Sequence, residues 1–532
     1  MGTRGGLSAF VIVGWLTALS LGASSVSADV APADLVQSRC GACHQHLDGG
    51  KLNRISAQRK TPEGWLMTIT RMEQIHNLKL EEPERRALVK FLADTQGLAP
   101  SETKGFRYVL ERRDDVVEKF PDEESGVICA RCHSFAQLAL QRRDAPEWLK
   151  TVHFHVAQWP TLEYQSRGRD RNWWDIASTR MPAKLAEIYP LSTPEWTSWR
   201  ARQPADVSGE WRIVGREPGK GAYEGRMAVT RGSGDEYTVA TELRYAGGEK
   251  AAGSGKAIVY TGYEWRASLE QGGESVSQVL ALSEAGDELV GRWFFTGRDS
   301  IGGDMRAVRQ VKSDPRILSV EPSYVRAGQR TEVAIHGVGL AGDVSLGPGI
   351  TIEPRDATPD TVRVVARVAA DAAAGTREVA VGAARVPALF AIYKKIDGVR
   401  VEPDYAIARI GGDGGSQPAV PIQFDAIGVL AGPDGTLGTD DDVRLGTMKA
   451  TWSVEDNGAI AKELHDAKFA GVMKPSGLFM PAAAGPNPKR PYRTNNAGDL
   501  TVRASVNDGG KSVAGTAHLV VSVQRWRNPP IR

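Results

Sequence analysis

The sequence predicts a multidomain protein in which a mainly helical N-terminal region precedes three all-β domains. The chain has 532 residues, which is enough for roughly three to four domains. Apolar residues recur with a helical period before about residue 205 and with a period of two after it. Glycine is concentrated in the second region, as in short strands joined by tight turns. The change in pattern marks the boundary between the helical region and the β domains.

Residues 1–28 predict a signal peptide. Arg4 supplies a positive start, Leu7 to Leu21 form an apolar stretch too short to favour a permanent span, and Val26 to Ala28 form a small-residue cleavage site. We therefore expect an exported chain that begins at Asp29, with an uncleaved anchor as the alternative. No later stretch is apolar enough to cross a bilayer, so we expect no membrane span in the mature chain.

The motif Cys-x-x-Cys-His occurs twice and uses every cysteine of the chain: Cys40, Cys43, Cys129 and Cys132. Two thiols one helical turn apart can add to the two vinyl groups of a porphyrin, and the adjacent histidine then reaches the iron. We therefore predict two covalently bound haem c groups with His44 and His133 as iron ligands. Zinc or a redox-active thiol pair is the alternative, but zinc needs further ligands and a thioredoxin motif needs no trailing histidine. Haem is attached outside the bacterial inner membrane, so motifs and leader together predict a periplasmic protein.

The region from 29 to 204 predicts two cytochrome c modules, about 29–100 and 101–204. Glu82 to Asp94 places its apolar residues on one helical stripe, and such a helix closes small cytochrome c domains by packing on the haem edge. Pro62 to Ile69 aligns with Pro146 to Val152 on their tryptophans, Trp65 and Trp148. The layout around the first motif is thus repeated around the second.

This internal alignment suggests the second ligand of each iron. Seven residues after the tryptophan, on the same helical face, Met72 stands in the first module and His155 in the second. We predict His44 and Met72 for the first haem and His133 and His155 for the second, because a bound haem needs something on its distal face. The rivals are His76 for the first haem, and His153 and Met181 for the second.

Residues 205–312 predict an antiparallel β-barrel. The strands are short, joined by glycine-containing turns and near-sequential, which favours a closed or nearly closed barrel over a Greek-key sandwich. No catalytic constellation occurs in it, and its tryptophans are expected in the barrel core. The predicted strands are 211–214, 225–230, 237–243, 256–261, 264–269, 279–282 and 288–295.

Two immunoglobulin-like sandwiches are predicted after the barrel, at 313–395 and 396–532. The first begins with Ile317 to Gly328 and Thr331 to Gly337, a pair of segments that resembles the start of immunoglobulin-like domains of the TIG kind. Folds of this class serve mostly as spacers and docking surfaces.

One loop of the last domain gathers carboxylates on a glycine-rich turn, from Asp434 to Asp442. These are the ingredients of a calcium site, although the spacing does not fit an EF-hand. A solvated acidic loop or a partner-binding edge is the alternative. The whole chain has a formal net charge of +2, which argues against a nucleic-acid or anionic-membrane partner.

The chain resembles the α subunit of quinohaemoprotein amine dehydrogenase over nearly its full mature length. The resemblance rests on the two haem motifs, the segments Gly64 to Met72 and Val156 to Tyr164, and the three β domains that follow. It implies a dihaem subunit that joins β and γ subunits in an enzyme that oxidises primary amines to aldehydes and ammonia. The γ subunit of that family carries cysteine tryptophylquinone, and this chain has no spare cysteine for one. We therefore expect this chain to take the electrons and to contain no catalytic residue.

The resemblance also implies a soluble external acceptor, such as a small cytochrome c or a copper protein. A freestanding dihaem cytochrome, or a dihaem peroxidase-like enzyme with binding-type sandwich domains, is the alternative function. A peroxidase needs one haem with an open sixth position. The sequence does not identify the amine, the acceptor or the order of the two haem potentials.

Overall fold

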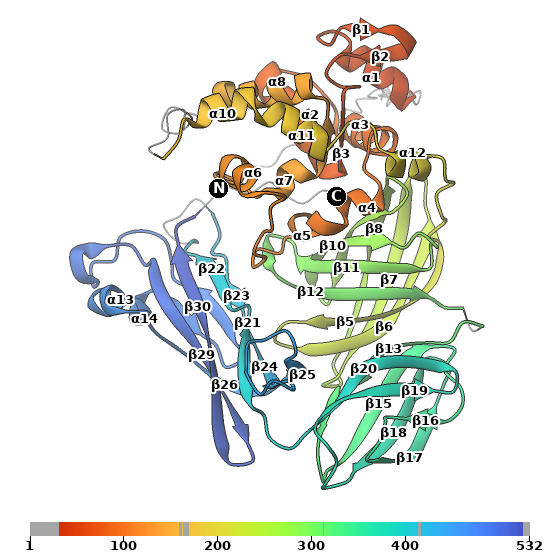
Figure 1. The fold of residues 1–532 in the computed structure, drawn as a ribbon, viewed down its shortest axis with the longest axis vertical. Coiled ribbons are helices and arrows are strands. Elements are labelled where there is room, and N and C mark those ends of the chain that lie inside the picture. Colours follow the sequence, from red (N-terminus) through yellow and green to blue (C-terminus); the bar gives the residue numbers. More distant parts are fainter. Residues whose placement is uncertain (1–30, 159–161, 163–169, 312, 413–416, 525–532) are drawn as a thin grey trace, which may run out of the picture.

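The computed structural model describes residues 31–158, 162, 170–311, 313–412 and 417–524, so the predicted signal peptide lies outside the described residues. A helical region caps one end of the β-barrel, and two further β domains lie at the barrel's other end and beside it (Figure 1). Within the described ranges, none of the helices combines the length and apolarity needed to cross a membrane.

The helical region contains two repeats of one layout. In each, a helix ends at the first cysteine of a motif, and a short strand then leads into a longer helix that carries a buried tryptophan. The strands of the two repeats, β3 and β4, pair with each other antiparallel. The predicted helix 82–94 is confirmed as α3. The elements are α1 Pro32–Cys40, β1 His46–Leu47, β2 Lys51–Leu52, β3 Gln58–Lys60, α2 Pro62–His76, α3 Glu82–Thr95, α4 Pro100–Thr103, α5 Arg107–Leu110, α6 Glu123–Cys129, α7 Ala136–Ala139, β4 Gln141–Arg143, α8 Ala145–Gln158, α10 Trp173–Thr179, α11 Met181–Ile188 and α12 Pro194–Arg200.

The barrel is closed and antiparallel, with eight strands. All seven predicted strands are present, and an eighth, β12, closes the cylinder by pairing with both β11 and β5. Trp211, Trp265 and Trp293 are almost fully buried in its core, as expected. The strands are β5 Gly209–Glu217, β6 Gly221–Arg231, β7 Glu236–Tyr245, β8 Lys250–Tyr260, β9 Glu264–Gln271, β10 Glu274–Leu282, β11 Glu288–Phe295 and β12 Arg298–Arg309.

The next domain consists of two four-stranded sheets, ordered β13-β15-β18-β17 and β14-β20-β19-β16. Side chains from both sheets share one apolar core, so the sheets pack face to face. The immunoglobulin-like assignment itself stays a prediction. The strands are β13 Arg316–Glu321, β14 Tyr324–Arg326, β15 Arg330–Val338, β16 Val344–Ser345, β17 Ile350–Ala357, β18 Thr361–Val368, β19 Gly375–Val381 and β20 Ala384–Tyr393.

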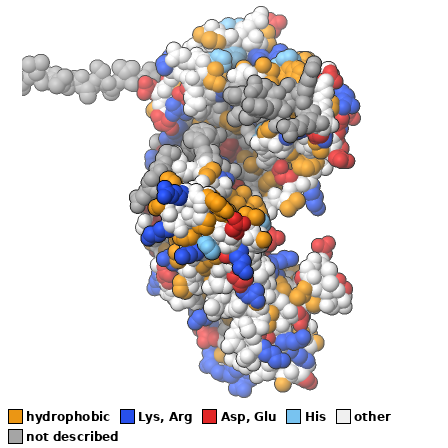
Figure 2. All heavy atoms as spheres, turned by 90° about the vertical axis from the view of Figure 1, so that its left-hand side faces the viewer, with side chains coloured by type: hydrophobic (Ala, Val, Ile, Leu, Met, Phe, Trp, Pro, Cys, Tyr) orange, Lys and Arg blue, Asp and Glu red, His pale blue; other side chains and the backbone are white. Residues whose placement is uncertain are grey.

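The last domain is more elaborate than the predicted sandwich. A four-stranded sheet, β22-β30-β29-β26, lies with two three-stranded sheets, β21-β24-β25 and β23-β28-β27. Figure 2, which looks at this side of the molecule, shows charges of both signs interspersed around a patch of apolar side chains. The elements are β21 Gly398–Glu402, β22 Tyr405–Arg409, β23 Ile422–Gln423, β24 Asp425–Leu430, β25 Val443–Thr447, β26 Ala450–Asp456, α13 Ala459–Leu464, α14 Asp466–Phe469, β27 Gly471–Met473, β28 Leu478–Pro481, β29 Gly498–Asp508 and β30 Lys511–Ser522.

Buried polar contacts fix the helical region to the barrel. Arg107 donates to Glu264 at 2.5 Å and Arg266 donates to Glu63 at 2.6 Å, and both barrel side chains are about 1% exposed. The Thr103 hydroxyl lies 3.0 Å from the Tyr263 hydroxyl. Because a buried charge that loses its partner is costly, these pairs hold the helical region and the barrel in one arrangement.

Candidate haem sites

The two Cys-x-x-Cys-His motifs have the same local structure. Each begins at the last residue of a helix, and in each the first cysteine packs against an apolar cluster while the second is exposed. In the first motif, the amide of His44 donates to the carbonyl of Cys40 at 2.9 Å. The cysteines of each motif therefore lie at the edge of an apolar cluster, where a planar apolar group could cover the exposed cysteine and the edge of the cluster.

Both motif histidines have their Nδ1 atoms occupied. Nδ1 of His44 lies 3.1 Å from the carbonyl of Asn53, and Nδ1 of His133 lies 2.9 Å from the carbonyl of Ser134. A histidine that ligates a metal usually donates its other ring N–H to such an acceptor, which fixes the tautomer and the ring orientation. Each ring is thus held so that Nε2 is the nitrogen available to iron.

His155 faces His133 across the second motif. Their ring centres are 6.5 Å apart and the ring planes differ by 26°. Nδ1 of His155 is occupied by the carbonyl of Thr151 at 3.0 Å. An iron between two imidazoles needs about 2 Å for each metal–nitrogen bond and about 1 Å from each nitrogen to its ring centre, about 6 Å in all. The pair therefore fits a six-coordinate haem with two histidine ligands.

The two rivals of His155 have different surroundings. His153 is exposed and lies edge-on to Trp174, with 5.1 Å between ring centres. Met181 is 1% exposed and belongs to the apolar cluster that contains Trp148 and packs against Cys129. Of the two histidines, His155 is the one whose ring lies beside that of His133.

The first module leaves its distal ligand open between two residues. Met72 is half-buried in α2, whereas His76 is the exposed last residue of that helix. The amide of Asn77 closes the helix on the carbonyl of Met72. Met72 is the less exposed of the two, which favours the methionine.

The first thiol of each motif does not have the character of a reactive cysteine. Burial raises the pKa of Cys129 to about 12, and burial followed by the neighbouring Cys43 raises the pKa of Cys40. Reactive cysteines depend on a lowered pKa, since the thiolate is the reactive form. These two raised pKa values therefore argue against a redox-active pair.

Glu118 holds the chain just after the second motif through hydrogen bonds, although no sequence pattern indicates this role. Its carboxylate accepts hydrogen bonds from the Tyr108 hydroxyl at 2.6 Å, the Ser134 hydroxyl at 2.5 Å and the amides of Phe135 and Ala136 at 2.9 and 3.1 Å. Although burial raises it, these hydrogen bonds hold the pKa of Glu118 below its usual range. Because Ser134 supplies the acceptor for His133, Glu118 positions this predicted iron ligand through Ser134.

Trp173 is a second contact that spacing alone did not reveal. Its indole N–H donates to the carbonyl of Ile128 at 2.8 Å, and its ring centre lies 6.4 Å from that of His155. It therefore connects α6, the helix that ends at the second motif, to His155, the predicted distal ligand. The dense aromatic run Trp173-Trp174 is the one sequence signal that could have suggested it.

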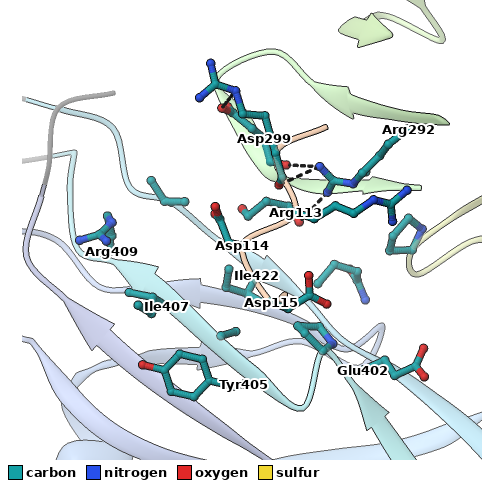
Figure 3. A pocket seen from close by; sticks show the side chains of 18 of the residues that line it. Arg113, Asp114, Asp115, Arg292, Asp299, Glu402, Tyr405, Ile407, Arg409 and Ile422 are labelled. Atoms are coloured by element: carbon teal, nitrogen blue, oxygen red, sulfur yellow. Dashed lines mark hydrogen bonds and ion pairs between the residues drawn. The ribbon is translucent and has the colours of Figure 1, made fainter. Parts of the chain in front are cut away.

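A cavity of about 890 Å³ lies where the chain between α5 and α6 passes between the barrel and the last domain. In Figure 3, Asp114 and Asp115 from this chain segment stand opposite Tyr405 and Ile407 of β22. The Arg292 guanidinium, also seen there, donates to backbone carbonyls, among them that of Glu111 at 2.8 Å. The same chain segment continues to Glu118, so it runs from the cavity to the second motif.

The acidic loop has internal uses for its carboxylates. Asp441 accepts from the amide of Asp434, and Asp442 accepts from that of Gly438. Across the described part of the chain, no group of three or more His, Cys, Asp or Glu side chains is arranged to hold a metal ion. The structure thus adds nothing in favour of calcium here.

Four family models match successive parts of the chain. The model described as "Quinohemoprotein amine dehydrogenase A, alpha subunit, haem binding" matches residues 30–196. Those for alpha subunit domains II, III and IV match 204–310, 314–394 and 399–531. The chain belongs to the quinohemoprotein amine dehydrogenase alpha subunit family. The resemblance in the sequence is therefore confirmed, and the alpha subunit's first domain binds haem.

Matches to individual proteins add little for this alpha subunit. No curated protein sequence matches it. A redesigned β-barrel, mFAP0, bound to DFHBI matches at 15% identity and TM-score 0.18, over 19% of this chain and 98% of its own. Domains 5-6 of the S-layer protein SbsC match at 13% identity and TM-score 0.13, over 40% of this chain and 100% of their own. Likenesses this weak carry no argument.

Proposed function

We propose that this alpha subunit is the dihaem electron-transfer subunit of a periplasmic amine dehydrogenase. Cys40, Cys43, Cys129 and Cys132 would hold two haem c groups, which supply a pair of one-electron carriers when bound. A tryptophylquinone on a partner subunit would oxidise a primary amine to an aldehyde and ammonia and pass the electrons to this chain. A soluble cytochrome or copper protein would then accept them.

The observation that carries this proposal is the facing pair of His133 and His155 at 6.5 Å. A haem with both axial positions filled transfers electrons and leaves no site for peroxide. The peroxidase-like alternative requires an open sixth position. The second module therefore favours the electron carrier.

The test is reconstitution. The purified haem-loaded chain alone should not oxidise amines, and its haem absorption should change to the reduced form when amine and the partner subunits are added. Spectra of two six-coordinate low-spin haems would support the carrier. Amine oxidation by the single chain, or a high-spin haem that reacts with peroxide, would refute the proposal.

The ligand assignment predicts the direction of electron flow. A methionine sulfur donates less to ferric iron than an imidazole does, so a His/Met haem normally has the higher potential of two otherwise similar haems. Electrons would enter at the haem of Cys129 and Cys132 and leave from that of Cys40 and Cys43.

Met72→His should therefore lower only the higher of the two midpoint potentials in a redox titration and slow reduction of the external acceptor. His76→Met serves as the matched variant. If Met72→His leaves both potentials unchanged and His76→Met alters one, then His76 is the ligand.

A further inference from the structure

Four cations gather between the two haem modules. Lys60 and Arg143 are 3% and 5% exposed, and Arg71 and Arg54 interact with both of them electrostatically. They come from both repeats, since β3 ends at Lys60 and β4 ends at Arg143. Like charges brought together in a buried place repel one another, so an arrangement of this kind needs an anion.

Lys60 and Arg143 occupy equivalent places in the two repeats. Each stands five residues before the buried tryptophan of its module. The Lys60 ammonium lies 5.3 Å from the ring centre of Trp65, and the Arg143 guanidinium lies 5.5 Å from that of Trp148. Each module therefore presents one buried cation beside its tryptophan, next to the cluster that holds its first cysteine.

The buried acid Glu147 neutralises this cluster only in part: it pairs with Arg54 and attracts Arg143 electrostatically. Among the residues that the structure describes, no carboxylate lies within ion-pair distance of Lys60, Arg71 or Arg143. The buried Glu147 accepts instead from Arg54 at 2.8 Å and from Lys150 at 2.5 Å. The ammonium of Lys60 has a hydroxyl partner, Thr68, at 2.5 Å.

Two buried donors at this place lack acceptors. Nε1 of Trp148 and Nε of Arg143 have no hydrogen-bond partner, and Trp148 is 1% exposed. Leaving a buried donor unmet costs about 1–3 kcal/mol, so unmet donors beside unpaired cations indicate a missing acceptor. Burial, together with Arg143, Arg71 and Arg54, also lowers the pKa of Lys60 well below its usual value, as expected for a cation without its anion.

The position relative to the second motif indicates which anion this is. Trp148 and His155 lie on the same helix, α8, separated by about 10 Å at about 1.5 Å of rise per residue. Arg71 packs over the ring of Phe154 at 4.4 Å and interacts electrostatically with His155. The unmet donors thus lie near the proposed iron ligand. Each haem carries two carboxylates on its propionate side chains, and these carboxylates are the anions that a haem would bring to this place.

We propose that Lys60, Arg71 and Arg143 of this cluster, together with Nε1 of Trp148, bind haem propionates at the junction of the two modules. Arg143 and Trp148 serve the second haem, and Lys60 serves the first. The assignment rests on the proposed function only in requiring that the haems are bound. With the propionates bound there, the cluster would have a second effect: its positive charge would favour the ferrous form of both haems.

The test uses the full haem-loaded chain and the variants Arg143→Met and Lys60→Met, which keep length and apolar volume but remove the charge. Covalent haem content should stay at the wild-type level, whereas both variants should lower a midpoint potential. Arg143→Met should act more strongly on the second haem and Lys60→Met on the first. Propionate bending bands in resonance Raman spectra should shift in the same variants. Lys79→Met, at an exposed position on the same module, should change neither readout.

Conservative variants guard against misfolding. Arg143→Lys and Lys60→Arg keep the charge, so they should restore the potentials while still shifting the propionate bands, because the geometry of the donors differs. Wild-type potentials and bands in both methionine variants, with normal haem content, would overturn the proposal. So would potentials that respond to inorganic phosphate, since a free anion would then be the occupant. A wild-type chain without covalent haem would instead contradict the proposed function.

Discussion

Two kinds of residue shape the predicted haem sites: residues that would contact the haem, and residues that hold these side chains in place. His133 and His155 belong to the first kind. Glu118 belongs to the second, because it fixes Ser134, whose carbonyl orients His133. One carboxylate that accepts four hydrogen bonds concentrates much of the local order in a single side chain.

We expect Glu118→Ala to destabilise the second module by roughly 2–4 kcal/mol, because two hydroxyl groups and two backbone amides lose their acceptor. Denaturant unfolding followed by haem absorbance measures this change. Glu118→Gln keeps one oxygen and should cost less than half as much. Two variants that both unfold like wild type would mean that the loop is held by other contacts.

At the scale of elements, the least predictable strand is the one that closes the barrel. β12 contains Gly302 and Gly303, and a strand pattern with adjacent glycines reads as a turn. The structure explains them, because a Cβ at Gly303 would lie 1.7 Å from the carbonyl of Arg216 and one at Gly302 would lie 2.1 Å from that of Trp293. Close backbone approach across the sheet, and not turn formation, requires both glycines.

The elements with a strong local signal were predictable and those defined by distant contacts were not. The helical stripe of α3 and the two haem motifs are visible in the sequence because their residues lie within a few turns of one another. Glu118 acts on residues 16 to 18 positions away, through a segment without periodicity. The pairing of β3 with β4 joins strands of three residues each, which are too short to show alternation.

Arg292 of β11 anchors the chain between α5 and α6. It donates to the carbonyls of Glu111 and Asp299 at 2.8 and 2.9 Å, and burial lowers its pKa to about 10. We expect Arg292→Gln to lower thermal stability, by roughly 2–4 kcal/mol, because several buried carbonyls lose their donor.

The matched control for Arg292 is Arg298→Gln on β12. That side chain is 36% exposed and pairs with Glu274 at 2.6 Å, so its removal should cost less than about 1 kcal/mol. Differential scanning calorimetry of both variants compares them. Equal losses would show that the segment does not depend on Arg292.

At the scale of the whole molecule, the β domains meet through polar contacts that respond to acid. His336 of β15 is 7% exposed and lies 3.0 Å from the Thr361 hydroxyl, near the barrel. Burial lowers the pKa of His336 to about 4. The charge of Glu224 raises this pKa, whereas the charges of Arg212 and Arg363 lower it. The folded protein therefore holds this ring neutral.

We expect this histidine to make the molecule less stable in acid. Above about pH 6.5 the ring is neutral in both states; as the pH falls toward 4, only the unfolded chain takes up the proton, and about 3 kcal/mol is lost. His336→Gln cannot titrate, so its stability should fall less between pH 7 and pH 4.5 than that of wild type in parallel thermal melts. His518→Gln on the surface is the control and should follow wild type. Parallel slopes for wild type and His336→Gln would contradict the assignment.

The contacts between the helical region and the barrel can form only after the later part of the chain has been made. Thr103 meets Tyr263, which lies 160 residues later in the chain. In a chain that emerges from its N-terminus, the helical region therefore becomes available before its barrel partner, by an interval that the rate of emergence sets. During this interval Arg107 lacks the carboxylate of Glu264, and the helical region lacks the barrel surface on which it packs. Haem insertion completed within the interval would act on an unsupported module, whereas later insertion would meet one already braced by the barrel.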